Sequence, residues 1–162
     1  AVFENNIPIS LKVFPIGGSE ITNDIALGLK IPLEEAEEAK RGSGMKIYSK
    51  KKLDDIIEAR LSDIFEIIDS HLKKIGKNGL LPAGIIITGG TSAIPLIEEL
   101  AKMSLRLPSQ VAEPDFAKNT NHQIVDSNWS VAYGLWNKGI NNEGEERTGI
   151  KLVRRTKGNL VS

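Results

Sequence analysis

The segment at residues 83–100, AGIIITGGTSAIPLIEEL, decides the fold class of this chain. Residues 84–88 form a short apolar run bounded by turn residues, which is typical of a strand buried on both faces of a largely parallel sheet. The pair Gly89 and Gly90 ends this run, and residues 95–103 then follow the amphipathic pattern of a helix. A strand, a tight turn and a helix in this order predict an α/β protein whose backbone at the glycines either packs closely or approaches a ligand.

Upstream of this segment, the sequence predicts a hairpin followed by a helix. Residues 1–16 carry β-branched and aromatic residues on both sides of the ENN motif at residues 4–6, and asparagine tolerates the positive φ of tight turns. Gly17 and Gly18 end the hairpin, and Ser19 is expected to cap the helix. The apolar face of this helix consists of Ile21, Ile25 and Leu29.

Further helices follow along the chain. A helix is predicted from Pro32 to about Arg41, because proline fits the first turn and acidic residues suit a helix N-terminus. Residues 52–75 show the clearest helical period, with apolar residues at steps of three and four. The remaining elements are expected to be short strands at residues 45–48 and 107–112, a polar loop at 114–127 and a last helix at 129–138.

Composition excludes several classes of function. The 162 residues include 21 basic and 21 acidic side chains, so the overall charge gives no support to a nucleic-acid partner. Cysteine is absent, which rules out disulfides and thiol catalysis and suits a reducing cytoplasm. Only His71 and His122 are present, far apart in sequence, and we expect no metal site built by this chain. No apolar run approaches the length of a bilayer span.

Two patterns are candidates for ligand binding. The glycine pair matches neither a phosphate loop nor a dinucleotide fingerprint, and close packing explains it as well as a ligand does. Glu37, Lys40 and Arg41 share one helical edge, where a carboxylate could accept hydrogen bonds from ribose hydroxyls beside cationic side chains that flatten against a base. An ordinary solvated helix face is the simpler explanation of this edge taken alone. The sequence offers no set of nucleophile, base and acid for catalysis.

The order of the motifs is more informative than any single one. The blocks VFPIGGSEITNDIALGLKIPLEEAEEAKR, IIEARLSDIFEII, LPAGIIITGGTSAIPLIEELA and WSVAYGL follow one another between residues 13 and 135. This succession resembles the FtsA family of bacterial actin-like division proteins, and the similarity runs from residue 1 to about residue 138. The GGSEITNDIALGLK and PLEEAEEAK blocks are specific to this family among the relatives of actin.

The resemblance implies an α/β protein with an actin-like ATPase fold, of the ribonuclease H-like type, in which two lobes close on ATP and magnesium. This chain corresponds to the second lobe and is expected to be a fragment, with both phosphate loops and most of the first lobe lying upstream of Ala1. Residues 1–30 and 83–127 correspond to subdomain IIA. Residues 31–82 correspond to the inserted, partner-binding subdomain IIB, residues 128–140 to a helix that returns to the first lobe, and residues 141–162 to a tail.

The family's nucleotide-facing residues can be placed on this sequence. Gly89 and Gly90 match the adenosine motif, Thr91 follows it, and Ile94 is expected to line the base. Related chaperone ATPases have an arginine after the glycine pair, where this chain has Ala93, so the contact with the base is expected to be thinner. The remaining positions match an AE-x-x-KR arrangement and a GG-x-x-ITND block. They are Glu37, Lys40, Arg41, Gly17, Gly18 and Asn23.

The resemblance also implies partners. Arg60 matches a family arginine implicated in binding the C-terminal peptide of FtsZ, the tubulin-like division protein, and a bidentate guanidinium suits a carboxylate. A surface salt bridge with Asp63 or Glu58 explains Arg60 equally well. Family members also assemble into actin-like polymers and end in an amphipathic membrane-binding helix. Residues 149–162 are a poor match to that helix, because they contain basic and apolar residues but no aromatic one.

Together these features predict an ATP-binding adapter in the cytoplasm that links FtsZ filaments to the inner face of the cell membrane and helps to assemble the division septum. The complete protein is expected to be at most a slow ATPase, and this fragment alone is expected to be inactive. Two alternatives remain open at this point. One is an assembly adapter of the PilM type, and the other is a catalytic ATPase or kinase with an actin fold.

Overall fold

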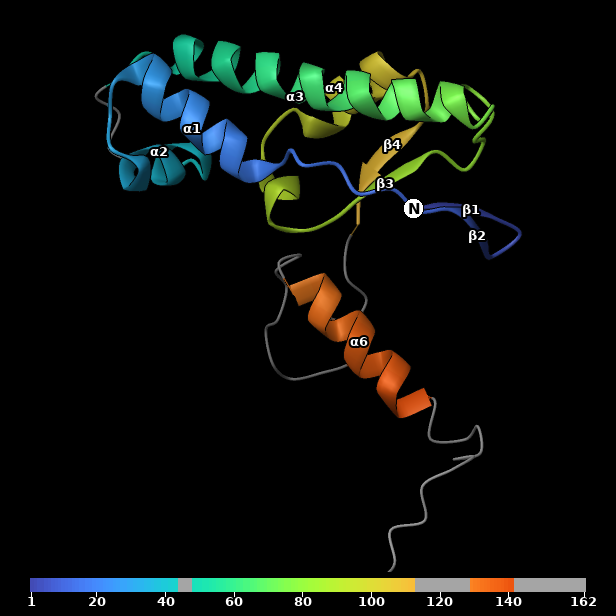
Figure 1. Ribbon diagram of the computed structural model, residues 1–162. Coiled ribbons are helices and arrows are strands. Elements are labelled where there is room, and N and C mark those ends of the chain that lie inside the picture. Colours follow the sequence, from blue (N-terminus) through green and yellow to red (C-terminus); the bar gives the residue numbers. More distant parts are fainter. Residues whose placement is uncertain (44–47, 113–128, 142–162) are drawn as a thin grey trace, which may run out of the picture. The chain divides into compact units, whose positions relative to one another are not determined.

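The computed structural model describes residues 1–43, 48–112 and 129–141 (Figure 1). The chain divides into two compact units, residues 1–130 and residues 131–162. The strand expected at residues 45–48, the loop at 114–127 and nearly all of the tail lie outside the described residues. The assignment of the chain to subdomains therefore stays a prediction.

The N-terminal hairpin is confirmed. Strands β1 (Val2–Glu4) and β2 (Ile7–Ser10) pair in antiparallel fashion. The two residues between them, Asn5 and Asn6, have φ values of 50° and 63°. A two-residue hairpin turn of the favoured hand needs positive φ at both positions, which asparagine accepts more readily than other non-glycine residues. The ENN motif thus determines where the chain reverses.

Helix α1 (Gly18–Leu29) begins two residues earlier than the predicted cap at Ser19 implies. The expected cap, Ser19, lies inside the first turn, and Gly17 occupies the N-cap position instead. The Glu20 side chain explains the difference, because its carboxylate accepts a hydrogen bond from the Gly17 N–H at 2.8 Å. The predicted apolar face is confirmed, since Ile21 and Ile25 are fully buried and Leu29 packs against the core.

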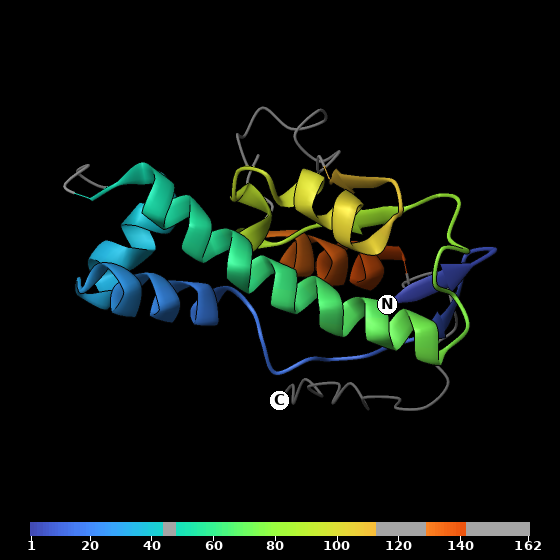
Figure 2. The same cartoon turned by 90° about the horizontal axis from the view of Figure 1, so that it is seen from above.

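Helices α2 (Leu33–Lys40) and α3 (Lys50–Lys74) pack against α1 and complete the larger part of the core. Figure 2 shows α3 running along the unit with α1 and α2 beside its N-terminal half. The periodicity of α3 is confirmed, because its buried side chains recur at intervals of four or seven residues, which keeps them on one face of the helix. These buried residues are Leu53, Ile57, Leu61, Phe65 and Leu72.

The segment that decided the fold class forms a parallel β–α–β unit. Strand β3 (Ile85–Ile87) is followed by the 3-10 turn η1 (Gly90–Ala93) and helix α4 (Ile97–Leu105), and β4 (Ser109–Val111) then pairs with β3 in parallel. Helix α4 packs against both α3 and β4. The predicted parallel pairing is therefore confirmed. The helix itself starts after Leu96, whose left-handed φ of 68° ends the preceding turn.

The expectation that the strand at residues 84–88 is buried on both faces is wrong. Ile86 is 63% exposed, whereas Ile85 and Ile87 are partly buried against the core. The reason is that β3 pairs only with β4 within the described chain, and the two-stranded sheet is covered on the face that carries Ile85 and Ile87. A short apolar run thus predicted the strand correctly but not its environment.

The second unit contains helix α6 (Ser130–Asn141), in agreement with the helix predicted at residues 129–138. Tyr133 and Trp136 lie one turn apart on it, with ring centroids separated by 5.6 Å. None of the helices in the described part of the chain combines the length and the apolar character needed to cross a membrane.

Candidate functional site

Three segments that are distant in sequence converge at the N-terminus of α1. They are the first turn of α1, the last turn of α2 and the glycine turn after β3. Gly89 has a φ of 98°, which favours glycine, and it lets the chain leave β3 sharply and enter η1. The turn is fixed by Ser92, whose hydroxyl donates to the Gly89 carbonyl oxygen at 2.6 Å. The glycine pair therefore presents exposed backbone at a defined place.

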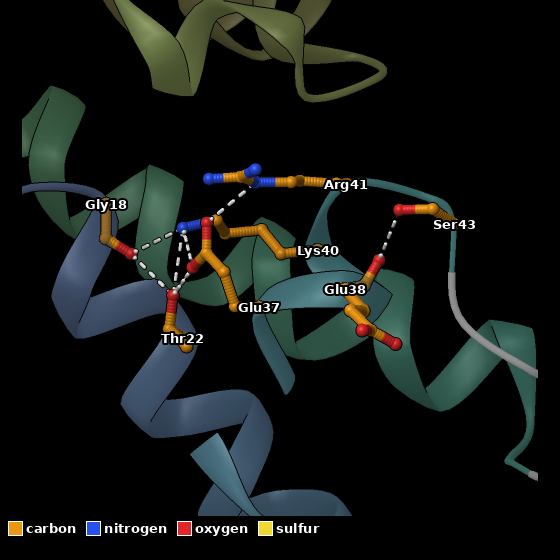
Figure 3. Close-up of polar contacts among 7 residues, drawn as sticks. All are labelled: Gly18, Thr22, Glu37, Glu38, Lys40, Arg41 and Ser43. Carbon is orange, nitrogen blue, oxygen red and sulfur yellow. Dashed lines mark hydrogen bonds and ion pairs between the residues drawn. The ribbon is translucent and has the colours of Figure 1, made fainter. Parts of the chain in front are cut away.

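Glu37 and Lys40 form the centre of a polar network that joins α1 to α2 (Figure 3). Glu37 Oε2 accepts hydrogen bonds from Lys40 Nζ and from the Thr22 hydroxyl, each at 2.6 Å. Lys40 Nζ also donates to Thr22 Oγ1 at 2.8 Å and to the Gly18 carbonyl oxygen at 3.1 Å. An ammonium group has three donors, so these three acceptors satisfy it completely.

The other oxygen of Glu37 faces a more open environment. Glu37 Oε1 accepts a hydrogen bond from Arg41 Nε at 3.0 Å. The Arg41 side chain is 70% exposed, whereas that of Lys40 is only 10% exposed. Ion pairs with exposed partners contribute little free energy, so a competing donor could replace Arg41 at this oxygen at small cost. Glu37 thus has one oxygen that is held by the fold and one that is accessible to a ligand.

The network also determines the protonation state of Glu37. Partial burial by itself would raise the pKa of this carboxyl group. Hydrogen bonds from Lys40 and Thr22 and the positive charge of Lys40 outweigh that effect, and Arg41 adds to it, so the pKa falls to about 2. At neutral pH the group is a carboxylate, which can only accept hydrogen bonds.

The three segments enclose a cleft of about 660 Å³. This volume lies within the range of roughly 300–1,000 Å³ that is typical of small-molecule and cofactor sites. Its walls combine glycine backbone, the charged edge of α2 and a few apolar side chains. The lining residues are Gly18, Ser19, Glu37, Lys40, Arg41, Gly90, Thr91, Ala93 and Ile94.

A close approach between α1 and η1 forms one wall of the cleft. A Cβ atom placed on Gly18 would lie 2.5 Å from Thr91 Oγ1 and 3.6 Å from Lys40 Nζ. The first distance is a clash and the second is ordinary contact, so a larger residue at position 18 would displace the Thr91 side chain. Gly18 is therefore needed for the shape of the site, independently of the backbone angles of helix α1.

Most of the residues predicted from the sequence come together in this cleft. Seven of the ten line it, namely Gly18, Glu37, Lys40, Arg41, Gly90, Thr91 and Ile94. Gly17 and Gly89 are neighbours of lining residues and shape the backbone on either side. Asn23 does not line the cleft, and its side chain is exposed. Adjacent helical residues face different directions, so the turn that aims Thr22 at α2 directs Asn23 to solvent.

Sequence reasoning missed Thr22 and Ser19. Thr22 is 7% exposed and is one of two buried polar residues in the described part of unit 1. Its position four residues after Gly18, on the buried side of α1 with Ile21 and Ile25, was a usable signal. A hydroxyl on an apolar helix edge needs a partner, and Glu37 and Lys40 supply it. In the parts of the chain that the structure describes, no three His, Cys, Asp or Glu side chains are grouped to hold a metal ion.

Arg60, the predicted partner-binding residue, lies on α3 away from this cleft. Its Nε donates to Asp24 Oδ2 of α1 at 2.5 Å, and its Nη1 lies 3.4 Å from Asp63 Oδ2. The hydrogen bond to Asp24 raises the pKa of Arg60. Of the two salt bridges considered from the sequence, the one with Asp63 is present, but the shorter contact is with Asp24, 36 residues away.

Comparisons with known proteins agree with this arrangement. The model of the family described as cell division protein FtsA matches residues 1–134. The FtsA of Pseudomonas aeruginosa is 28% identical, over 90% of this chain and 40% of the relative. The FtsA of Bacillus subtilis is 34% identical over 72% of this chain and 31% of the relative. The FtsA of Neisseria meningitidis is 30% identical over 100% of this chain and 45% of the relative.

The chain thus spans less than half the length of these curated relatives. The match nevertheless covers both the hairpin and the β–α–β unit, together with all three segments of the cleft. It also agrees with the α/β class of the fold, with its parallel pairing of β3 and β4. The chain belongs to the FtsA family of cell division proteins, which have an actin-like ATPase fold.

Proposed function

We propose that the cleft between α1, α2 and η1 binds the nucleoside part of ATP. The observation that carries this proposal is the split environment of Glu37. Lys40 and Thr22 hold Oε2, whereas among the described residues Oε1 has only the exposed Arg41 as a partner. A ribose offers neighbouring hydroxyl donors, and a carboxylate with an accessible oxygen is a suitable acceptor for them.

The other walls fit the remainder of a nucleoside. Gly90 has no side chain, so a ribose or base can lie directly against the backbone of η1. Ala93 contributes an exposed apolar surface next to Ile94, which is itself only 5% exposed, and the exposed guanidinium of Arg41 can stack on an aromatic base. A cleft of about 660 Å³ has room for such a group. Arg41 would then exchange its contact with Glu37 for one with the base.

The phosphates and magnesium are assigned to other parts of the complete protein. Lys40 is the buried cation of the cleft, but its three donors are already used by Gly18, Thr22 and Glu37. Of the two cations that line the cleft, only Arg41 is therefore available to the phosphates. We assign recognition of the phosphates to regions of the complete protein outside this chain. We expect weak nucleotide binding and no hydrolysis by this chain alone.

Within the cell, we propose that the complete protein links FtsZ filaments to the inner face of the membrane at the division site. The role of the family in cell division supports this proposal. Arg60 is the proposed contact for the FtsZ C-terminal peptide. Its pair with Asp63 is long at 3.4 Å, and the Asp63 side chain is 60% exposed, so a peptide carboxylate can take the place of Asp63.

Self-association into actin-like polymers and attachment to the membrane through the tail belong to the same proposal, and they rest on the family alone. The alternatives of a PilM-type adapter and of a catalytic relative have no comparable support. The comparisons give the FtsA family, which favours the division adapter over both alternatives.

The nucleoside proposal is tested with adenosine, because it lacks the phosphates that this chain is not expected to hold. Isothermal titration would compare the native chain with Glu37→Gln and Glu38→Gln. Glu38 is the matched control, since it is exposed on the same helix and points away from the network (Figure 3). We expect the first variant to bind adenosine at least about tenfold more weakly, which corresponds to about 1.4 kcal/mol, and the second to bind like the native chain. Equal affinities in all three proteins would contradict the proposal.

A further inference from the structure

A second cavity lies at the opposite end of α3 from the nucleoside cleft. We call it the α3 groove. It has a volume of about 430 Å³ and is formed by the chain after β2 and by the last turns of α3. Its lining residues are Lys12, Phe14, Ile67, Ser70, His71, Lys74 and Ile75. None of them lines the nucleoside cleft, and the proposed function uses none of them.

The walls of the groove are held together by contacts between the hairpin segment and α3. The ring of His71 lies 5.8 Å from that of Phe14 in an edge-to-face arrangement. His71 Nε2 is also 3.0 Å from the Ser10 hydroxyl. Beyond the end of α3, Lys77 Nζ donates to the Glu4 carboxylate at 3.1 Å. These contacts fix both walls relative to each other, so the groove exists before any partner binds.

The chemistry of the groove is that of an apolar floor with a positively charged rim. Phe14, Ile67 and Ile75 provide the apolar surface, and Ile67 remains 39% exposed. Lys12 and Lys74 contribute the charges. In the described part of the chain neither of them makes an ion pair, whereas their neighbours Lys73 and Lys77 are paired with Asp69 and Glu4. Asp69 and Glu4 are thus engaged by lysines other than the two on the rim.

We propose that the α3 groove is a docking site for an acidic peptide segment that inserts one apolar side chain and places carboxylates beside it. Charge complementarity favours this partner, because two unpaired ammonium groups flank a site for an apolar anchor. A nucleic acid is a less suitable occupant, since phosphate recognition commonly uses more cations and arginine. The volume of the groove matches a single large side chain and its flanking backbone.

The proposal can be tested by NMR titration of the ¹⁵N-labelled chain with a synthetic peptide in which one leucine is flanked by two glutamates on each side. We expect chemical-shift changes at the amides of residues 10–14 and 67–75. The double variant Lys12→Glu with Lys74→Glu should weaken binding at least about tenfold. The control is Lys50→Glu with Lys51→Glu, which makes the same change in charge at exposed positions at the other end of α3.

Two further peptides separate charge from apolar contact. Replacing the glutamates by glutamine, or the leucine by alanine, should each reduce affinity severalfold. The α3 groove and the nucleoside cleft share no lining residue, so this proposal does not depend on the nucleoside proposal. Glu37→Gln should accordingly leave the peptide affinity unchanged. Shift changes spread over the whole chain, equal weakening by both lysine pairs, or equal affinity for the glutamine peptide would each overturn the proposal. Circular dichroism would verify that both double variants are folded.

Discussion

The hydroxyl of Thr22 in α1 donates a hydrogen bond of 2.6 Å to Glu37 Oε2 in α2, and Lys40 Nζ donates to the same oxygen. This contact joins two helices that are separated by a turn and fixes the carboxylate at the edge of the cleft. Glu37 is therefore positioned by Lys40 of its own helix and by Thr22, an uncharged residue outside the α2 motif that drew attention to the site.

Thr22→Val should destabilise the chain, because it removes the hydroxyl and leaves Glu37 and Lys40 with one partner fewer. The expected loss in free energy of unfolding is about 1–2 kcal/mol, since the side chain is buried and its acceptor is charged. Urea denaturation measures the change. Thr22→Ser retains the hydroxyl and should recover most of the stability, so an equal loss in both variants would point to packing rather than to the hydrogen bond.

Acid should destabilise the chain in part through Glu37. Its pKa falls from the ordinary 4.5 to about 2 in the folded state, so the unfolded state binds a proton first as pH decreases. The stabilisation from the charged group is complete above about pH 4.5 and is lost as the pH falls toward about 2. The difference in unfolding free energy between the native chain and Glu37→Gln should therefore shrink across this range. For the exposed control Glu38→Gln, which lies outside this network, the difference in unfolding free energy from the native chain should not shrink in this way.

Gly84→Ala should be among the more damaging substitutions in the β–α–β unit. Gly84 has a φ of +78°, and an added Cβ would lie 2.2 Å from the Pro108 carbonyl oxygen, which belongs to backbone and cannot rotate away. Gly79→Ala is the control, because Gly79 also has a positive φ of +66° but has open space around it. We expect about 1 kcal/mol for Gly79→Ala from backbone strain, and at least about twice that for Gly84→Ala. Equal losses in thermal denaturation would show that the contact with Pro108 is easily relieved.

Arg60→Ala should weaken binding of a labelled FtsZ C-terminal peptide at least about tenfold in fluorescence anisotropy, if Arg60 exchanges Asp63 for a peptide carboxylate. Arg60→Lys should restore little, since an ammonium cannot reach Asp24 and a second carboxylate with the planar fork of a guanidinium. Arg106→Ala, at an exposed arginine after α4, serves as the control. Unchanged binding in Arg60→Ala would leave the arginine with a structural role in joining α1 to α3.

The sequence predicted the helices and the hairpin because their signals are local. The apolar period of α3 and the two asparagines of the first turn act within a few residues of themselves. Burial of Ile86 was predicted wrongly because it depends on how many strands lie beside β3. That number is a property of the whole sheet, and the apolar run of β3 contains no information about it.

In the candidate site, too, the features that depend on local spacing were predicted and those that depend on packing between helices were not. Glu37, Lys40 and Arg41 share one edge of a helix, which their spacing indicates directly. The contact between Arg60 and Asp24 joins residues that are 36 positions apart, and the choice of Thr22 over Asn23 depends on the rotation of α1 about its axis. Both are fixed by the packing of α1 against α2 and α3, which one sequence does not specify.

The most direct measurement for the central claim combines a change in the ligand with a change in the protein. Adenosine and 2′,3′-dideoxyadenosine differ only in the ribose hydroxyls, from which Glu37 Oε1 is proposed to accept hydrogen bonds. Titration of both ligands into the native chain and into Glu37→Gln gives four affinities. The account predicts that the native chain prefers adenosine by about tenfold or more and that Glu37→Gln has little preference. Equal affinity of the native chain for the two ligands, or an undiminished preference in Glu37→Gln, would contradict it.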